Sequence, residues 1–177
     1  KAVIKELAPG LGQHTKEILS SLIVPHDDLT TSKTQNNVLP LSGVRILDFS
    51  QAIAGPVLTQ LLAQFGAEVI KVESSAHQQR GRDSGKIDPR IRLQQKVTFA
   101  DVNRNKLSIT VNLATEHGRD LIRKLVPHCD VIVENFSPRV MQKWELDYNN
   151  LCALRGDIIL ARLPGFGLNS PYKEYIG

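Results

Sequence analysis

The chain is poor in the residues that build metal centres, disulfide frameworks and stacking surfaces for bases. Its 177 residues include two cysteines, one tryptophan and 5% aromatic residues. Cys129 and Cys152 form no Cys-x-x-Cys motif and the five histidines do not pair at metal-ligand spacing. We therefore expect no metal site, and a reducing compartment, the cytoplasm. No apolar run is long enough to span a bilayer and no signal-peptide pattern is present, so we expect no membrane partner.

Positive charge is present but dispersed along the chain. The formal net charge is +4, which favours an anionic partner. A nucleic-acid surface needs clustered Lys and Arg residues or stacking aromatic rings, and the sequence shows neither, so we expect no nucleic-acid partner. A small molecule that carries phosphate fits this composition better.

The hydrophobic pattern divides the chain into three segments. Residues 1–22 have a helical pattern, and residues 23–40 are rich in polar turn formers, which indicates a linker. Ordered alternation of apolar strands and helices begins at Leu41 and continues through residues 41–177.

Residues 43–73 are the most informative stretch, because they predict a strand, a tight turn, a helix and a second strand. The first strand ends at Asp48, and the turn at 53–56 contains Pro56, which suits a first helical turn. Gly66 follows the helical pattern and stands where a left-handed cap is expected. A right-handed crossover then places the turn at the carboxyl edge of a parallel sheet, where ligands bind.

The rest of the chain repeats the order of strand and helix. The expected strands are 108–112, 131–133 and 158–161, and the expected helices are 115–125, 140–144 and 148–154. Thr115 is expected to cap the first of these helices. This order predicts an α/β fold: a Rossmann-like parallel sheet with flanking helices, preceded by a helical segment and a linker.

Six motifs in this order resemble a known family. They are Val44-Arg-Ile-Leu-Asp-Phe-Ser50, Ala54-Gly-Pro56, Gly66-Ala-Glu-Val-Ile-Lys-Val-Glu73, Asn103-Arg-Asn-Lys-Leu-Ser108, Asp130-Val-Ile-Val-Glu-Asn-Phe136, and Gly165-Phe-Gly167 with Ser170-Pro-Tyr172. Together they resemble the family III CoA-transferases of the CaiB/BaiF type, which include formyl-CoA and carnitine CoA-transferases and the related α-methylacyl-CoA racemase. The resemblance implies a Rossmann-like sheet whose edge holds coenzyme A, in a protein that forms interlocked dimers.

The N-terminal segment carries a second resemblance. Residues 9–19, with the run Gly12-Gln-His-Thr15, are similar to the closing segment of a domain of this family, yet they precede the opening motif. We therefore expect a tandem protein. Residues 1–22 would be the tail of one domain, residues 23–40 a linker, and residues 41–177 the N-terminal part of a second large domain. An interlocked homodimer and a tandem intramolecular pair both stay open.

The resemblance also implies the chemistry. In the transferases, an Asp accepts the acyl group as a mixed anhydride and passes it on through an enzyme-bound CoA thioester. The motif order places this Asp beyond Gly177, so no catalytic residue is assigned here, and this chain alone is expected to show no turnover. The implied substrates are acyl-CoA and a carboxylic acid. The implied contacts with coenzyme A come from Ile53, Ala54, Val111, Asn112, Asn135, Phe136, Ser137 and Lys143.

Several of these positions have a structural alternative. The turn at Ile53 and Ala54 also suits a plain connection from strand to helix, and contact there would be through the backbone. Asn135 could cap the following helix while Phe136 packs in the core. Residues 104–106 suit either phosphate contact or a solvated loop.

Two positions depart from the family pattern. Ser74 and Ala114 stand where relatives carry basic residues, and Arg80 or Arg82 could replace the first of these as a phosphate ligand. Three functions therefore stay open: CoA transfer between carboxylic acids, racemisation of an acyl-CoA, and a catalytically inactive scaffold for CoA binding or dimerisation.

Overall fold

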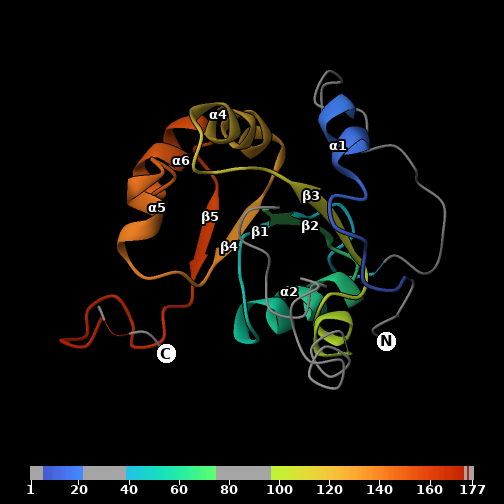
Figure 1. The fold of residues 1–177 in the computed structure, drawn as a ribbon, viewed down its shortest axis with the longest axis horizontal. Coiled ribbons are helices and arrows are strands. Elements are labelled where there is room, and N and C mark those ends of the chain that lie inside the picture. Colours follow the sequence, from blue (N-terminus) through green and yellow to red (C-terminus); the bar gives the residue numbers. More distant parts are fainter. Residues whose placement is uncertain (1–5, 22–38, 75–96, 174, 176–177) are drawn as a thin grey trace, which may run out of the picture.

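The computed structural model describes residues 6–21, 39–74, 97–173 and 175. A five-stranded sheet forms its centre in the order β3-β2-β1-β4-β5, and all neighbouring strands are parallel (Figure 1). The strands are β1 (Arg45–Asp48), β2 (Glu68–Glu73), β3 (Lys106–Thr110), β4 (Val131–Glu134) and β5 (Ile159–Arg162). The predicted α/β fold with a parallel, Rossmann-like sheet is confirmed.

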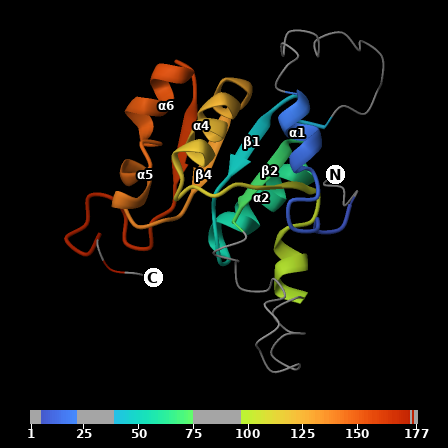
Figure 2. The same cartoon turned by 45° about the horizontal axis from the view of Figure 1, so that its top comes forward.

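Helices cover both faces of the sheet (Figure 2). One face carries α2 (Ala54–Gln64), and the other carries α4 (Glu116–Leu125), α5 (Arg139–Lys143) and α6 (Tyr148–Leu154). A short helix, α1 (Thr15–Ser21), lies beside β3, and the 3-10 turn η2 (Val126–His128) follows α4. Among the helices that the structure describes, none is both long enough and apolar enough to cross a membrane.

The central strands are buried on both faces, which explains their nearly continuous apolar sequences. Ile46 and Val69 face α2 and pack with apolar residues of that helix. Leu47, Ile70 and Ile132 point to the opposite face, where they join the larger cluster beneath α4, α5 and α6. The alternation along each strand therefore supplies two cores, one on each side of the sheet.

Local signals set the helix ends as the sequence predicts. The Thr115 hydroxyl accepts a hydrogen bond from Gly118 N at 3.1 Å and starts α4, which ends at Leu125. Helix α6 covers the predicted residues, and the Asp147 carboxylate caps it through Asn149 N at 3.2 Å. Gly66 follows α2 with φ +107°, a conformation that favours glycine.

Several expected boundaries shift slightly, and β4 extends one residue further than expected, to Glu134. Strand β3 occupies 106–110 rather than 108–112, because Lys106 already pairs with Val69 of β2. Strand β5 begins at Ile159, one residue later than expected, and α5 covers 139–143 rather than 140–144.

The expectation of a helix over residues 1–22 is wrong for most of the described part. Residues 6–14 are not helical, and α1 begins only at Thr15. Proline and two glycines disfavour a helix there, and Gly12 takes φ +65°. The backbone of this segment bonds to β3 instead. Most of the expected linker, residues 23–38, lies outside the described residues.

The two cysteines provide a test of the fold. Cys129 is fully buried, and burial raises the pKa of its thiol to about 12, whereas Cys152 is half-buried. In the native chain at about pH 8, we expect iodoacetamide to modify Cys152 roughly a hundred times faster than Cys129. Peptide mass spectrometry measures both rates. Denaturant should make the rates similar, and similar rates without denaturant would contradict the burial of Cys129.

Candidate functional site

A pocket of about 180 Å³ lies at the carboxyl edge of the sheet. Its wall comes from residues at or just after the ends of β1, β2, β3 and β4, and from Trp144 after α5. The lining residues are Phe49, Ser50, Gln51, Lys71, Val72, Glu73, Ser74, Val111, Asn112, Leu113, Ala114, Phe136 and Trp144. Open parallel sheets bind their ligands at this edge.

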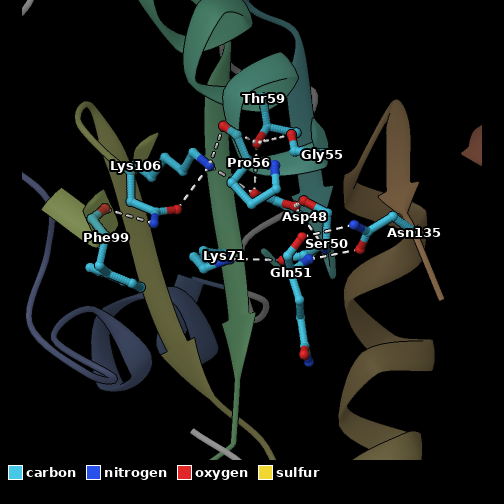
Figure 3. Close-up of polar contacts among 11 residues, drawn as sticks. Asp48, Ser50, Gln51, Gly55, Pro56, Thr59, Lys71, Phe99, Lys106 and Asn135 are labelled. Atoms are coloured by element: carbon cyan, nitrogen blue, oxygen red, sulfur yellow. Dashed lines mark hydrogen bonds and ion pairs between the residues drawn. The ribbon is translucent and has the colours of Figure 1, made fainter. Parts of the chain in front are cut away.

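A buried ion pair supports the turn between β1 and α2 (Figure 3). Lys106 Nζ lies 3.0 Å from Asp48 Oδ2, and both side chains are fully buried. Lys106 Nζ also donates to the Pro56 carbonyl at 2.9 Å, and Thr59 Oγ1 donates to Asp48 Oδ2 at 2.7 Å. Asp48 Oδ1 accepts hydrogen bonds from both Ser50 N and Ser50 Oγ. The ion pair therefore holds both ends of the turn.

The ionisation of this pair follows from its surroundings. Burial alone would raise the pKa of Asp48, but the charges of Lys106 and Lys71, with hydrogen bonds from Ser50 and Thr59, hold that pKa below its ordinary value. Burial lowers the pKa of Lys106 to about 8, although Asp48 partly offsets this effect. Near neutral pH both groups are therefore charged, and each charge favours the ionised form of the other group.

Two further side chains hold the pocket side of the same turn. Lys71, in the carboxyl-terminal half of β2, donates from Nζ to the Ser50 carbonyl at 2.9 Å. Asn135, just after β4, accepts from Gln51 N and donates to the Gln51 carbonyl, each at 2.8 Å (Figure 3). Three adjacent strands and the residue that follows a fourth thus converge on one turn, through Asp48, Lys71, Lys106 and Asn135.

Strand register explains the convergence. Asp48 pairs with Lys71 across β1 and β2, and Lys71 pairs with Ser108 across β2 and β3. Paired residues of a parallel sheet point to the same face, so a polar row crosses the sheet beside the pocket. Ser108 Oγ donates to Glu73 Oε2 at 2.7 Å, which joins Glu73 on the pocket wall to this row.

The structure brings three of the eight proposed coenzyme A contacts onto the pocket wall: Val111, Asn112 and Phe136. Phe136 packs edge-on against Trp144, with ring centroids 5.3 Å apart. The side-chain amide of Asn135 is hydrogen-bonded to the backbone of Gln51, so this side chain holds the turn in place. The other four, Ile53, Ala54, Ser137 and Lys143, are exposed and lie outside the pocket lining.

Sequence reasoning missed the polar residues beneath the turn. Lys106 was expected in a loop or against phosphate, yet it is buried against Asp48. Lys71 was absent from the expected site, although a lysine inside an apolar central strand is itself a signal of a buried polar partner. Arg80 and Arg82, the proposed substitutes for a basic residue at Ser74, lie outside the described residues.

Comparison with known proteins identifies the family. A family model described as CoA-transferase family III matches residues 41–177. The chain belongs to CoA-transferase family III. The match covers the whole sheet and pocket but not the N-terminal segment.

Similar proteins that are named as CoA-transferases extend this match. Succinyl-CoA–D-citramalate CoA-transferase of Chloroflexus aurantiacus is 42% identical over 139 residues, which cover 78% of this chain and 34% of that protein. Human succinyl-CoA:glutarate CoA-transferase is 37% identical over 142 residues, which cover 80% of this chain and 32% of that protein. The chain thus spans about a third of the length of these relatives.

Solved structures of similar proteins share the fold. A CAIB/BAIF family protein from Brucella suis superposes with a TM-score of 0.67 at 37% identity, over 80% of this chain and 37% of its own. A hypothetical protein from Mycobacterium tuberculosis gives a TM-score of 0.69 at 37% identity, over 80% of this chain and 38% of its own.

The turn of this family III chain contains a strained residue. Ala52 has φ +60°, a conformation that L side chains rarely adopt, and the Asn135 clamp on Gln51 holds the neighbouring backbone. We expect Ala52→Gly to stabilise the chain by about 0.5–1 kcal/mol in urea unfolding, because glycine relieves this strain. The matched control, Ala153→Gly at an exposed position of helix α6, should destabilise it by a similar amount. Loss of stability in both variants would contradict the strain at Ala52.

Proposed function

We propose that the parent protein is an acyl-CoA:carboxylate CoA-transferase of the cytoplasm, and that this chain supplies its CoA-binding part. The observation that carries the proposal is the pocket at the carboxyl edge of a family III sheet, with Val111, Asn112 and Phe136 on its wall. The substrates are acyl-CoA and a free carboxylic acid. No step of the reaction requires a metal ion in this proposal.

The chemistry of the pocket wall supports this ligand. Phe49, Phe136 and Trp144 offer aromatic faces and edges to the adenine ring or to the pantetheine arm. Asn112 adds an amide for phosphate or carbonyl oxygens, and the buried Lys71, which holds the Ser50 carbonyl, adds positive charge behind the pocket wall. The volume of about 180 Å³ is below the roughly 300–1,000 Å³ of pockets that enclose a whole drug-sized ligand. The pocket therefore takes one portion of CoA, while the rest contacts other surfaces.

The buried carboxylates of the described chain have structural partners. Asp48 is paired with Lys106, and Glu134 is paired with Arg162 and accepts a hydrogen bond from Phe136 N. A transferase also needs a carboxylate nucleophile that attacks the thioester carbonyl, releases the CoA thiolate and becomes an acyl anhydride. We assign that role to an Asp beyond Gly177.

Trapping of the intermediate in the full-length parent tests this proposal. The protein is incubated with succinyl-CoA, as a probe, and hydroxylamine or borohydride, and the modified residue is mapped by mass spectrometry. We expect CoA transfer to an added carboxylic acid and an adduct on an Asp beyond Gly177. An adduct on Glu73 of the pocket would contradict this division of roles. Exchange of the α-proton of an acyl-CoA without any adduct would favour the racemase.

The assembly of the parent is part of the same proposal. Two relatives are named as the alpha and beta subunits of succinyl-CoA–L-malate CoA-transferase in Chloroflexus aurantiacus, at 34% and 35% identity. We propose that the parent likewise works as a pair of large domains, either as an interlocked homodimer or as a tandem pair in one chain. Mass measurement by light scattering on the full-length protein separates these arrangements.

A further inference from the structure

Asn103 lies between a helical segment and the start of β3. Residues 97–102 are helical, and Asn103 after them is buried. Its Nδ2 donates to the Phe99 carbonyl at 2.9 Å, and its Oδ1 accepts from Lys106 Nζ at 2.9 Å. A carbonyl can only accept and an ammonium can only donate, so the two partners fix the orientation of the amide. Asn103 therefore joins the last turn of this helical segment to Lys106.

The ammonium of Lys106 has one acceptor for each of its three N–H groups. Besides Asn103 Oδ1, Nζ donates to Asp48 Oδ2 at 3.0 Å and to the Pro56 carbonyl at 2.9 Å (Figure 3). Asp48 ends β1, and Pro56 lies in the first turn of α2. Two of the bonds therefore hold the two ends of the turn between β1 and α2, and the bond to Asn103 fixes the position of the ammonium.

A neutral Lys106 cannot keep this arrangement. An amine has two N–H groups and a lone pair, and a lone pair repels an oxygen atom that it faces. One of the three contacts must therefore open when the proton leaves. The buried Asp48 carboxylate also loses its counter-ion. The position of the turn thus depends on the proton of Lys106.

The charges that act on Lys106 come from β1 and β2. Burial lowers the pKa of Lys106 to about 8; the charge of Asp48 opposes this effect, that of Lys71 adds to it, and that of Glu73 opposes it. Helix α2, which packs over Lys106, contains no ionisable residue. Two charged side chains beside Asn103 in the sequence pair with each other at 3.0 Å: Asp101 and Arg104.

We propose that Asn103 is a positioning residue for the turn between β1 and α2, and that it acts by holding Lys106 as an ammonium with three hydrogen bonds. Ser50 and Gln51 of this turn lie on the pocket wall, so a displaced turn changes the pocket. The effect on CoA binding rests on the proposed function, whereas the effect on the turn does not.

Nuclear magnetic resonance tests the effect on the turn without any ligand. The ¹³C-labelled chain is titrated from about pH 7 to about pH 10, and the signals of Lys106 Cε, Ser50 and Gln51 are followed. We expect the three residues to titrate with one midpoint near pH 8. Asn103→Ala removes an acceptor of the ammonium and should lower this midpoint by about one pH unit, whereas Asn103→Asp adds a carboxylate and should raise it by about one unit.

The opposite directions of these shifts separate positioning from a general loss of stability. Asn149→Ala provides the matched control, because Asn149 is exposed on α6, and its midpoint should equal that of the native chain. Equal midpoints in the two Asn103 variants would overturn the proposal, and so would signals of Ser50 and Gln51 that do not follow Lys106. If Asn103→Ala does not fold, the native titration and Asn103→Asp decide the question.

Binding of a CoA derivative tests the consequence for the pocket. The probe is the S-methyl thioether of CoA, which lacks the titrating thiol, and calorimetry measures its dissociation constant over the same pH range. We expect the affinity to fall about threefold or more as the pH rises through the Lys106 midpoint. This fall should move to lower pH in Asn103→Ala and to higher pH in Asn103→Asp.

Two outcomes distinguish this inference from the proposed function. Signals of the turn that follow Lys106, with no binding of the probe at any pH, would contradict the proposed function alone. Binding of the probe with the same affinity throughout the range would contradict the link between Asn103 and the pocket.

Discussion

Replacement of Asp48 by Asn is expected to lower the free energy of unfolding by about 3–5 kcal/mol. The substitution leaves the Lys106 ammonium buried without its counter-ion, 0% of its side chain being exposed. It also replaces a carboxylate that accepts hydrogen bonds from Ser50 and Thr59. Urea unfolding at neutral pH, followed by the fluorescence of Trp144, measures the loss.

A surface pair provides the matched control for this variant. Asp157→Asn removes the same charge from an exposed pair with Arg155, and it should leave the urea midpoint almost unchanged. The double variant Asp48→Asn, Lys106→Met should lose less stability than the sum of the single variants, because neither then leaves a buried charge alone. A midpoint for Asp48→Asn equal to that of Asp157→Asn would show that the buried pair does not stabilise the fold.

The same ion pair predicts the response to acid. The pKa of Asp48 is held below its ordinary value of 3.8, so the folded chain binds its proton less readily than the unfolded chain does. The contribution of Asp48 to stability is therefore fully present above about pH 4 and is lost as the pH falls through the lower, folded pKa. The stability difference between the native chain and Asp48→Asn should shrink in that acid range.

Gly55→Ala is expected to weaken CoA binding by at least about tenfold. Gly55 is buried at the start of α2, and a Cβ there would lie 2.2 Å from the Ser50 Cβ. The turn must move to admit the methyl group, and Ser50 and Gln51 on the pocket wall move with it. Isothermal titration of the folded variant with CoA measures this change.

Gly156 provides the control for this prediction. A Cβ on Gly156 meets nothing within 4 Å, so Gly156→Ala should bind CoA as the native chain does. Both variants should keep Cys129 protected from alkylation, which separates a displaced turn from an unfolded chain. Native affinity in Gly55→Ala would mean that the turn between β1 and α2 does not contact the ligand.

Strands and helices followed from local signals in the sequence. The apolar run of β1, the Thr115 cap of α4 and the apolar spacing of α2 each act over a few residues, so their positions were predictable. The N-terminal segment was not, since its helical pattern competes with contacts to a strand some ninety residues away. Pairing of His14 and Thr15 with β3 has no local sequence signal.

The candidate site was likewise predictable where local sequence signals act and not where distant strands meet. Phe136 and Asn112 could be placed at a carboxyl edge because each follows a predicted strand. The support beneath the turn depends on which strands are neighbours: Asp48 and Lys106 meet only because β1 and β3 flank β2. Family resemblance implied a ligand role for Asn135, whereas in the structure its amide holds Gln51.

Titration of this chain with CoA tests the central claim most directly. Trp144 is the one tryptophan in the sequence and lines the pocket, so its fluorescence reports on a ligand there. We predict a saturable change in fluorescence, with a dissociation constant between about 1 μM and 1 mM, and a matching heat of binding in calorimetry. No change up to about 10 mM CoA, with Cys129 still protected, would contradict the assignment of this pocket to coenzyme A.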